Sequence, residues 1–356
     1  MKTNVVSLKS FPAILGVMVF FSSFLNAQKV FDSDSILHIT IQGNVRGLLN
    51  DRTAAASRDF PMNLTITIEG GTEITLPVNM KTRGHFRKLK ENCIYPPLLI
   101  QFIDTGSMRN TWFGHQKELK LVMPCQGEEY VLREWMVYKL YNLITPMSFK
   151  ARLVQLTLVD EKAKKRDASI YAFLLEDEDH MAKRNQSIIL DKKIIPQQAQ
   201  MKPFLTTAVF EYMVGNTDWG VQFLQNIKLI AKDTNSRPIV IPYDFDHAGI
   251  VNAPYAKPAP ELQLSSVRER RYRGYCIQSL NQYDEIISLF NDLKPQFYNL
   301  FNSSTLLKPK YINSTLQFLD GFYNTIHNTK SWQKEFTYPC DKRGTGNVVI
   351  KGLKAD

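Results

Sequence analysis

The chain has 356 residues, of which 44% are hydrophobic and 22% are charged, proportions that are ordinary for a globular protein. Its 17 glycines and 17 prolines are too few for a collagen-like or low-complexity chain, and its four cysteines are too few for a disulfide-dense mini-protein. The formal net charge of +10 favours anionic partners without identifying one. A chain of this length is expected to form two or three domains, or one large bilobal unit.

A secretory signal is predicted at the amino terminus. Lys2 and Lys9 precede an apolar stretch at residues 11–25, and the small residue Ala27 stands before a polar one. Cleavage is therefore expected after Ala27, which would leave an extracytoplasmic protein in the periplasm, on the cell surface or secreted. The apolar stretch is shorter than the roughly 20 residues that span a bilayer. No stable membrane span is predicted, with an uncleaved anchor as the alternative.

Export would place the four cysteines in an oxidising compartment, where an even number favours two disulfides. Pairing each cysteine with its nearer partner in the sequence predicts Cys93–Cys125 and Cys276–Cys340. A zinc site is the alternative, but the chain has no C-x-x-C spacing and its six histidines are scattered.

The first half of the exported chain reads mainly as strands, from residue 36 to residue 176. Leu64, Ile66 and Ile68 alternate with threonines as in a half-buried strand, and Gly70-Gly71 favours a hairpin turn into the next strand. Later strands are predicted at 74–83, 98–103, 119–123, 152–159 and 170–175. One helix, which ends near Ile144, interrupts them with an apolar residue every three or four positions.

After Asp179 the pattern becomes helical. Apolar faces predict three helices, around 205–212 with an end at Gly215, around 283–290 and around 312–326, with two short strands at 227–231 and 239–243. The layout predicts an α+β chain of two lobes. Its expected parts are the signal at 1–27, a strand-rich amino-terminal lobe with one helix at 28–178, a helical carboxy-terminal lobe at 179–342 and a tail at 343–356.

The densest run of polar residues in an apolar setting lies between residues 216 and 246. Asp218 leaves a predicted helix, Asn226 opens a strand, and Asp244 follows the next strand. Phosphoryl transfer needs an aspartate that orients the nucleophile, and an asparagine and an aspartate that hold Mg²⁺. The order predicts Asp218 as the catalytic residue and Asn226, Asp244 and Asp246 as metal ligands. Asn226 follows Asp218 by eight positions, against five in the protein-kinase motif.

Other roles are open for these residues. Aspartate and asparagine are common in turns because their side chains bond nearby backbone groups. A calcium site at Asp244 and Asp246 is a further option, although the spacing of an EF-hand is absent. The same two carboxylates could serve a carbohydrate hydrolase, whose mechanism depends on their separation.

The amino-terminal half offers residues for a nucleotide. Arg83 lies in a predicted turn, Lys81-Thr82-Arg83-Gly84-His85, where backbone amides and basic side chains could cover phosphates. Lys120 lies in a predicted strand and Glu134 in the helix that follows, the arrangement that fixes the phosphate-binding lysine of a kinase. Glu176 begins an acidic segment where a hinge between lobes would run. The predicted cofactor-binding residues are therefore Lys120, Glu134, Arg83 and Glu176, with a surface lysine and solvated acids as the alternative.

These motifs carry a family resemblance. Asn216-Thr217-Asp218-Trp219, Gln225-Asn226 and Pro242-Tyr243-Asp244-Phe245-Asp246, with Leu174-Leu175-Glu176-Asp177 upstream, resemble the CotH kinase-like family, which is named for a spore-coat protein. The resemblance runs from about Lys81 to Gly274 and extends to the metal motif of aminoglycoside and choline phosphotransferases. It implies a bilobal, atypical protein-kinase-like fold that uses ATP and a divalent metal. Asp218 would be its catalytic aspartate and Asp244 its metal-binding one.

The leading interpretation is an exported CotH-like kinase that uses ATP and Mg²⁺ to phosphorylate a protein or a cell-surface component. A kinase-shaped binding or assembly protein without turnover is the alternative, because ATP is scarce outside the cytoplasm. The arginine cluster within residues 268–273 could bind a substrate phosphate or an acidic peptide, or could form a solvated face. Nucleic acid is not an expected partner, because these basic residues do not alternate with aromatic ones.

Overall fold

The structure is a computed structural model, and it describes residues 30–340 apart from 54–56, 68–70, 72, 104–112, 115, 164–168 and 278. The predicted secretory signal with its cleavage site, the first glycine of the predicted hairpin turn and the predicted tail at 343–356 lie outside the described residues. Within them, no helix combines the length and the apolar character needed to cross a membrane.

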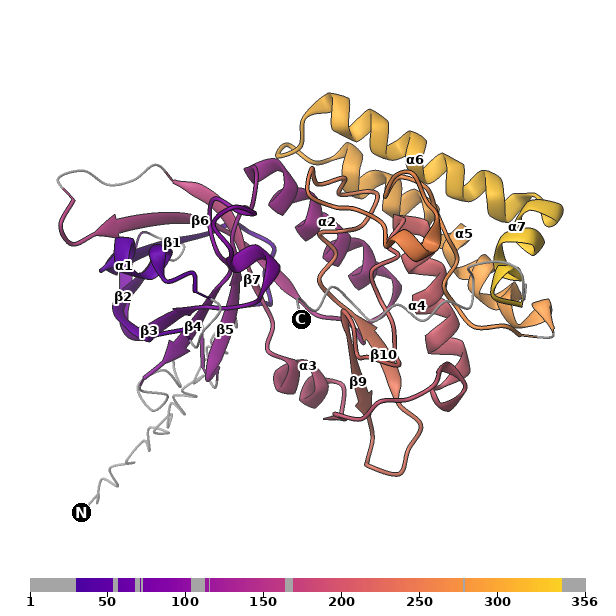
Figure 1. Cartoon of the computed structure of the whole chain (residues 1–356), viewed down its shortest axis with the longest axis horizontal. Coiled ribbons are helices and arrows are strands. Elements are labelled where there is room, and N and C mark those ends of the chain that lie inside the picture. The colour runs from indigo at the N-terminus through magenta and orange to yellow at the C-terminus, as the bar shows by residue number, and fades with distance from the viewer. Residues whose placement is uncertain are drawn as a thin grey trace, which may run out of the picture.

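Seven strands close into a barrel in the amino-terminal region, as Figure 1 shows from the side. The strand order is β1-β2-β3-β4-β5-β7-β6, and β6 returns to pair with β1. This last pair is parallel, with Leu37 opposite Val154, whereas the other neighbouring strands are antiparallel. The strands are β1 (Leu37–Gly43), β2 (Phe60–Thr67), β3 (Glu73–Thr82), β4 (Leu98–Phe102), β5 (Glu118–Val122), β6 (Ala151–Asp160) and β7 (Ile170–Leu175).

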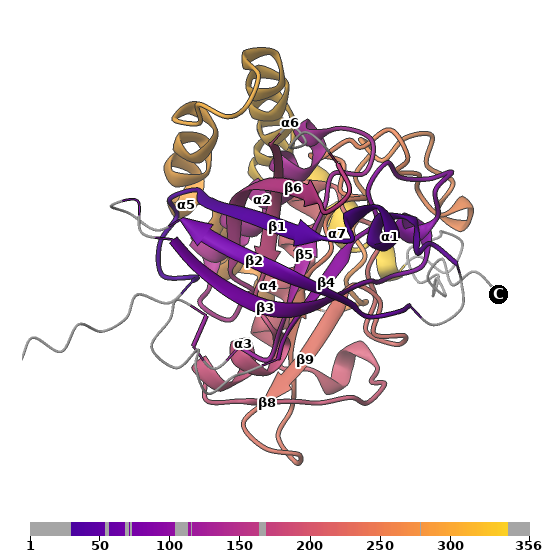
Figure 2. The same ribbon diagram turned by 90° about the vertical axis from the view of Figure 1, so that its left-hand side faces the viewer.

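Alternating apolar side chains fill the interior of the barrel. In β2, Met62, Leu64 and Ile66 are buried, while Pro61 and Asn63 between them are exposed. A period of two places one face of each strand in the core. The predicted alternation of Leu64 and Ile66 is confirmed, and the third residue of that pattern lies outside the described residues. Figure 2 shows β1 to β4 side by side on the outer wall of this barrel.

The helical region packs against the opposite wall of the barrel. Helix α2 (Glu128–Ile144) contacts β6 and β7 on one side and α5 (Asp284–Asn302) on the other. The residues of β6 and β7 are therefore buried in long runs, because both faces of these strands lie in a core. The predicted helix before Ile144 is confirmed and begins earlier than its apolar face indicated. A short helix, α1 (Val45–Asn50), follows β1.

The centre of the helical region is α4 (Met201–Val214), which is buried along most of its length. It ends at Gly215 as predicted, where a φ of 70° places the backbone in the left-handed region that favours glycine. Helices α6 (Pro309–His327) and α7 (Thr329–Phe336) complete the region (Figure 1). The helices predicted around 283–290 and 312–326 are confirmed as α5 and α6.

A small sheet with the order β10-β9-β8 lies beside α4. Its strands are β8 (Ile188–Ile189), β9 (Ile227–Ala231) and β10 (Ile239–Pro242), and β8 follows the connecting helix α3 (Glu178–Arg184). The two strands predicted here are confirmed as β9 and β10. Because β10 ends at Pro242, the acidic sequence after it forms a loop.

The prediction of a bilobal kinase-like fold is wrong. The strands of the amino-terminal region close into a seven-stranded barrel, whereas a kinase-like lobe has an open sheet. Closure depends on the parallel pairing of β1 with β6, which are far apart in the sequence. Alternation predicts that a strand has a buried face, but it does not identify the strand beside it. A helical region does follow the barrel.

Both predicted disulfides are present, Cys93–Cys125 and Cys276–Cys340, and no described cysteine is free. The first joins the connection between β3 and β4 to the segment that leads into α2. The second joins the segment before α5 to the turn after α7. Disulfides form and persist mainly in oxidising compartments, so the two bonds fit an extracytoplasmic protein.

We expect the purified native protein to incorporate no alkylating reagent before reduction and to gain four alkyl groups after it, because all four cysteines are paired. Replacing Cys276 and Cys340 with serine should lower the free energy of unfolding by about 2–4 kcal/mol, since the bond restricts a long loop of the unfolded chain. Mass spectrometry and urea unfolding would measure the two effects. Alkylation of unreduced native protein at all four cysteines would contradict the pairing.

Candidate functional site

A buried charge cluster lies where the barrel meets the helical region. Arg87, on a short 3-10 helix (Phe86–Lys88) after β3, places its guanidinium 3.4 Å from Glu134 of α2 and 3.5 Å from Asp246. Its Nη2 also donates to the carbonyl oxygen of Met123 at 2.7 Å. Glu134 and Asp246 are only 2% and 5% exposed. Neither carboxylate could stay charged in such a place without a partner, which Arg87 supplies.

Burial dominates the electrostatics of this cluster. It raises the pKa of Glu134 well above the usual value, an effect that Arg87 opposes and Asp246 reinforces. Burial alone would lower the pKa of Arg87, but Tyr255 and the two carboxylates raise it. Tyr255 also donates its hydroxyl to Asp246 Oδ2 at 3.1 Å. Asp246 is therefore engaged by Arg87 and by Tyr255. This arrangement suits a carboxylate that holds Arg87 in place better than it suits the predicted metal ligand.

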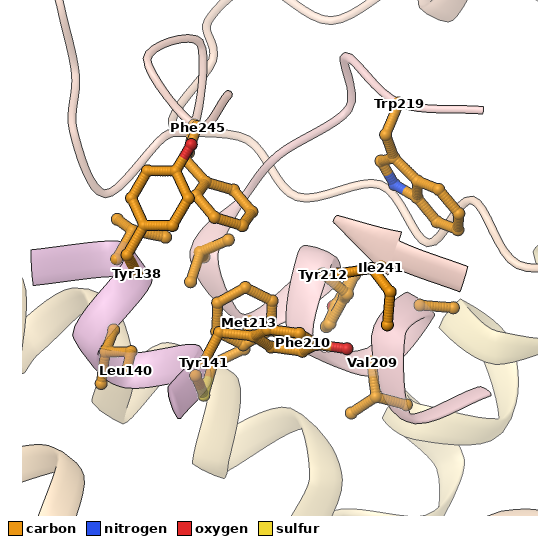
Figure 3. Close-up of a cluster of buried hydrophobic side chains, with 14 of the residues drawn as sticks. Tyr138, Leu140, Tyr141, Val209, Phe210, Tyr212, Met213, Trp219, Ile241 and Phe245 are labelled. Atoms are coloured by element: carbon orange, nitrogen blue, oxygen red, sulfur yellow. The ribbon is translucent and has the colours of Figure 1, made fainter. Parts of the chain in front are cut away.

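Asp244 follows β10 in a loop whose backbone is strained. Its φ of 62° lies in the left-handed region, which residues other than glycine seldom adopt. The Asp244 N–H donates to the Tyr138 hydroxyl at 2.8 Å, and Phe245 is fully buried against the rings of Tyr138 and Phe210 (Figure 3). The buried Phe245 of the D-F-D sequence thus fixes the loop in the core between α2 and α4, and it thereby fixes the positions of the aspartates on either side of it.

The carboxylate of Asp244 lies among charges of both signs. Burial raises its pKa and Asp246 raises it further, while Arg87 and Arg83 oppose this. Arg83 follows β3, and its buried Nε has no hydrogen-bond partner among the described residues. Of the predicted site residues, the structure therefore brings Arg83, Asp244, Asp246 and Glu134 together. Perturbed carboxylates beside incompletely bonded cations are typical of functional sites.

Asp218 lies in the loop after α4 and is tied to the start of β9. Its Oδ1 accepts a hydrogen bond from Gln225, and its Oδ2 accepts one from Asn226 Nδ2 at 2.9 Å. Asn226 has a φ of 49° and also donates to the Asp218 carbonyl oxygen at 2.7 Å. Burial raises the pKa of Asp218, and His247 opposes this. Asp218 lies within electrostatic reach of Asp244, so the residues predicted for transfer and metal binding share one place.

The predicted pair of Lys120 with Glu134 does not form. Lys120 of β5 lies 3.8 Å from Glu178 of α3, and Glu134 pairs with Arg87. The sequence analysis missed Arg87 because it lies in a turn, where no periodic pattern distinguishes a buried basic residue from an exposed one. Lys120 is nevertheless within electrostatic reach of Asp244.

Glu176 has a structural role rather than the predicted cofactor-binding one. It is fully buried, and its two oxygens accept hydrogen bonds from Arg184 at 2.9 Å. The Lys150 N–H donates to it at 2.9 Å, and His180 Nδ1 lies 3.0 Å from it. Burial would raise the pKa of Glu176, but the bonds from His180 and Arg184 lower it. These bonds fasten α3 to the end of the barrel.

Arginines of the run 268–273 also face the interior. Arg270 lies over the ring of Phe318, 3.7 Å from its centre, and donates to backbone carbonyl oxygens. Arg273 donates to the carbonyl oxygens of the residues on either side of Asp218. Neither a substrate-binding patch nor a solvated face, the two roles considered from the sequence, describes these side chains. They fix loops, and Arg273 fixes the loop of Asp218.

No group of three or more histidine, cysteine, aspartate or glutamate side chains within the described part of the chain is arranged to hold a metal ion. Mg²⁺ needs few protein ligands, because it usually keeps several waters and binds through one or two carboxylates plus substrate phosphates. Asp244 has a carboxylate for this purpose. Asn226 has its amide oxygen, because the amide nitrogen is bonded to Asp218.

Comparisons with known proteins leave the family open. No family model matches the chain, and no curated protein matches it. The resemblance to CotH-like kinases therefore rests on the motifs alone, and the site has to be interpreted from its own geometry.

Glu211 of α4 is a further buried acid that the sequence analysis did not select. It is fully buried, and neither of its carboxyl oxygens has a hydrogen-bond partner among the described residues. Burial raises the pKa of Glu211 well above the usual value; the neighbouring Asn216 side chain opposes this, and the charge of Asp218 adds to it. Burial therefore favours the protonated form of Glu211 in the folded protein.

We expect Glu211→Gln to stabilise the protein at neutral pH. The unfolded chain releases the Glu211 proton above about pH 4.3, whereas the folded protein retains it. The wild type therefore loses stability as the pH rises from that value toward the folded-state pKa, and glutamine, which does not titrate, loses none. Urea unfolding at a series of pH values should show an advantage of the variant that grows with pH. An advantage independent of pH, or an equal one in the exposed control Glu285→Gln, would contradict a raised pKa of Glu211.

Proposed function

We propose that the protein transfers a phosphoryl group from ATP to a hydroxyl group of a protein or cell-surface component, with Mg²⁺ as cofactor. One observation carries the proposal: the half-buried carboxylate of Asp244 lies within electrostatic reach of a second half-buried acid, Asp218, and of the basic groups of Arg83 and Lys120. A bound metal and a polyphosphate together present the complementary pattern of charge. The metal alone would not account for the basic side chains, and the polyphosphate alone would not account for the carboxylates.

The residues fit a divalent cation. The raised pKa of Asp244 comes from burial and from the nearby charge of Asp246, and a cation beside Asp244 would relieve both effects. Asp244 and the amide oxygen of Asn226 would hold it. When bound, Mg²⁺ would neutralise charge on the phosphate oxygens. The backbone strain at Asp244 and Asn226, with φ of 62° and 49°, supports a binding role, since strain of this kind gathers where side chains must be aimed.

Asp218 would act as the proton acceptor. Its two oxygens receive amide hydrogen bonds from Gln225 and Asn226, which fix the carboxylate and still leave lone pairs for an incoming hydroxyl group. Burial raises the pKa of Asp218, which makes it a better base. Arg273 supports its loop from behind. Arg83 and Lys120 would bind the phosphates.

The other functions considered from the sequence find less support in this geometry. A carbohydrate hydrolase would need Asp244 and Asp246 as its two carboxylates, but Arg87 and Tyr255 engage Asp246. A binding protein without turnover shares every feature of the site except the use of Asp218 as a base. The experiment below therefore separates binding from transfer.

We expect Asp244→Asn to weaken Mg²⁺-dependent ATP binding, because a charge that faces the metal is lost. Asp218→Asn should leave ATP binding nearly unchanged while it lowers phosphate transfer by roughly 10²–10⁴, the usual scale for a positioned base. Calorimetry would measure binding, and phosphate incorporation into an acceptor mixture would measure transfer.

The exposed Asp292 of α5 gives a matched control, Asp292→Asn, which should change neither quantity. Thermal unfolding would show that each variant is folded. If wild type binds Mg²⁺-ATP but transfers nothing, the protein is a binding protein. If wild type shows no Mg²⁺-dependent binding at all, the acids are architectural and the proposal fails.

A further inference from the structure

Three basic side chains from separate elements lie within electrostatic reach of one another near Asp244. Lys120 comes from β5 of the barrel, Lys228 comes from β9 of the small sheet, and Arg83 follows β3. Lys120 and Lys228 lie 3.8 Å and 2.7 Å from the same carboxylate oxygen of Glu178. One carboxylate thus serves two ammonium groups that belong to different parts of the fold.

The positive charge at this place exceeds what Glu178 can neutralise. Burial lowers the pKa of Lys120, and the like charges of Arg83 and Lys228 lower it further, while Glu178 and Asp244 oppose them. The buried Nε of Arg83 lacks a hydrogen-bond partner among the described residues. Like charges held together in a half-buried place are costly unless an anion joins them.

The side chains around these cations are partly shielded from water. Lys120, Lys228 and Glu178 are 25%, 28% and 30% exposed, so each is reachable from solvent but largely covered. The Nζ of Lys120 also lies 5.6 Å from the ring centre of Tyr243, the residue before Asp244. Lys120 therefore lies beside the residue that precedes the proposed metal ligand.

We propose that Arg83, Lys120 and Lys228 form a subsite for a linear polyphosphate, and that Glu178 is an internal counter-ion which the polyphosphate displaces. The inference rests on the proposed function and adds Lys228 and Glu178 to its site. A ligand with several negative charges fits better than a single carboxylate, because three cations converge and the one carboxylate of Glu178 neutralises only part of their charge. Displacement of Glu178 would let the ligand bridge the barrel and the small sheet directly.

The test is calorimetric binding of inorganic tripolyphosphate without metal, which isolates the subsite from Asp244. Lys228→Gln should weaken binding about tenfold, because a charge-assisted hydrogen bond is lost. Lys228→Arg should retain most of the affinity, since the charge remains. Glu178→Gln should instead tighten binding severalfold, because the ligand no longer competes with a carboxylate. A structural role for Glu178 predicts the opposite sign.

The exposed ion pair of Lys202 with Glu285 supplies matched controls. Lys202→Gln and Glu285→Gln should leave tripolyphosphate affinity unchanged, which excludes a general effect of net charge. Weaker or unchanged binding in a folded Glu178→Gln protein would overturn the displacement, and unchanged binding in Lys228→Gln would overturn the subsite.

The outcomes also distinguish this inference from the proposed function. If tripolyphosphate binding follows the expected pattern but the wild-type protein does not transfer phosphate from Mg²⁺-ATP, the subsite stands and the phosphotransferase proposal fails. If wild type transfers phosphate while Lys228→Gln and Glu178→Gln bind tripolyphosphate as wild type does, the function stands and the subsite fails.

Discussion

The burial of charge between the barrel and the helices is the constraint on which the rest of the site depends. Glu134 and Asp246 are almost completely removed from water, and Arg87 is the cation that makes this tolerable. Arg87 must in turn be held in place, although it lies on a loop between strands. The disulfide Cys93–Cys125 and the hydrogen bond to the Met123 carbonyl fasten that loop to the segment before α2.

Two sets of charged groups result, and they differ in what they leave for a ligand. Arg87 forms ion pairs with Glu134 and Asp246, although Arg87 Nε and Glu134 Oε1 lack hydrogen-bond partners among the described residues. Asp244 and Arg83 sit beside these ion pairs with their demands only partly met, because burial raises the pKa of Asp244 and the Nε of Arg83 is unbonded among the described residues. Ion pairs hold the first set together, whereas the charges of the second set leave interaction energy for binding. The proposed function follows from this contrast.

Sequence patterns predicted local structure well and long-range pairing poorly. The alternation in β2, the apolar faces of α4, α5 and α6 and the end of α4 at Gly215 depend on neighbouring residues, which the sequence displays directly. Closure of the barrel depends on β1 meeting β6, and no local pattern encodes that. The nearer-partner rule for cysteines gave both bonds, although Cys276 and Cys340 are 64 residues apart in the sequence.

The site shows the same division between local order and three-dimensional pairing. Asp218, Asn226 and Asp244 were identified from residue types on consecutive elements, and the structure does place them together. The ion-pair partners of these residues were not predictable from the sequence. Lys120 and Glu134 were paired only because a strand lysine and a helix glutamate follow one another in the same order in kinases. The partner of Glu176, Arg184, lies at the far end of the helix that follows it, and the sequence did not reveal this pairing. In each case the sequence did not show which oppositely charged residue pairs with the charged side chain.

The most direct test of the account is a crystal structure of the protein with Mn²⁺ and a non-hydrolysable ATP analogue, in which the metal is located by its anomalous scattering. We expect the anomalous peak at the Asp244 carboxylate, within coordination distance of the Asn226 amide oxygen, with the analogue's phosphates against Arg83 and Lys120. A metal bound elsewhere, or a nucleotide that leaves Asp244 without contact to metal or phosphate, would contradict the central claim.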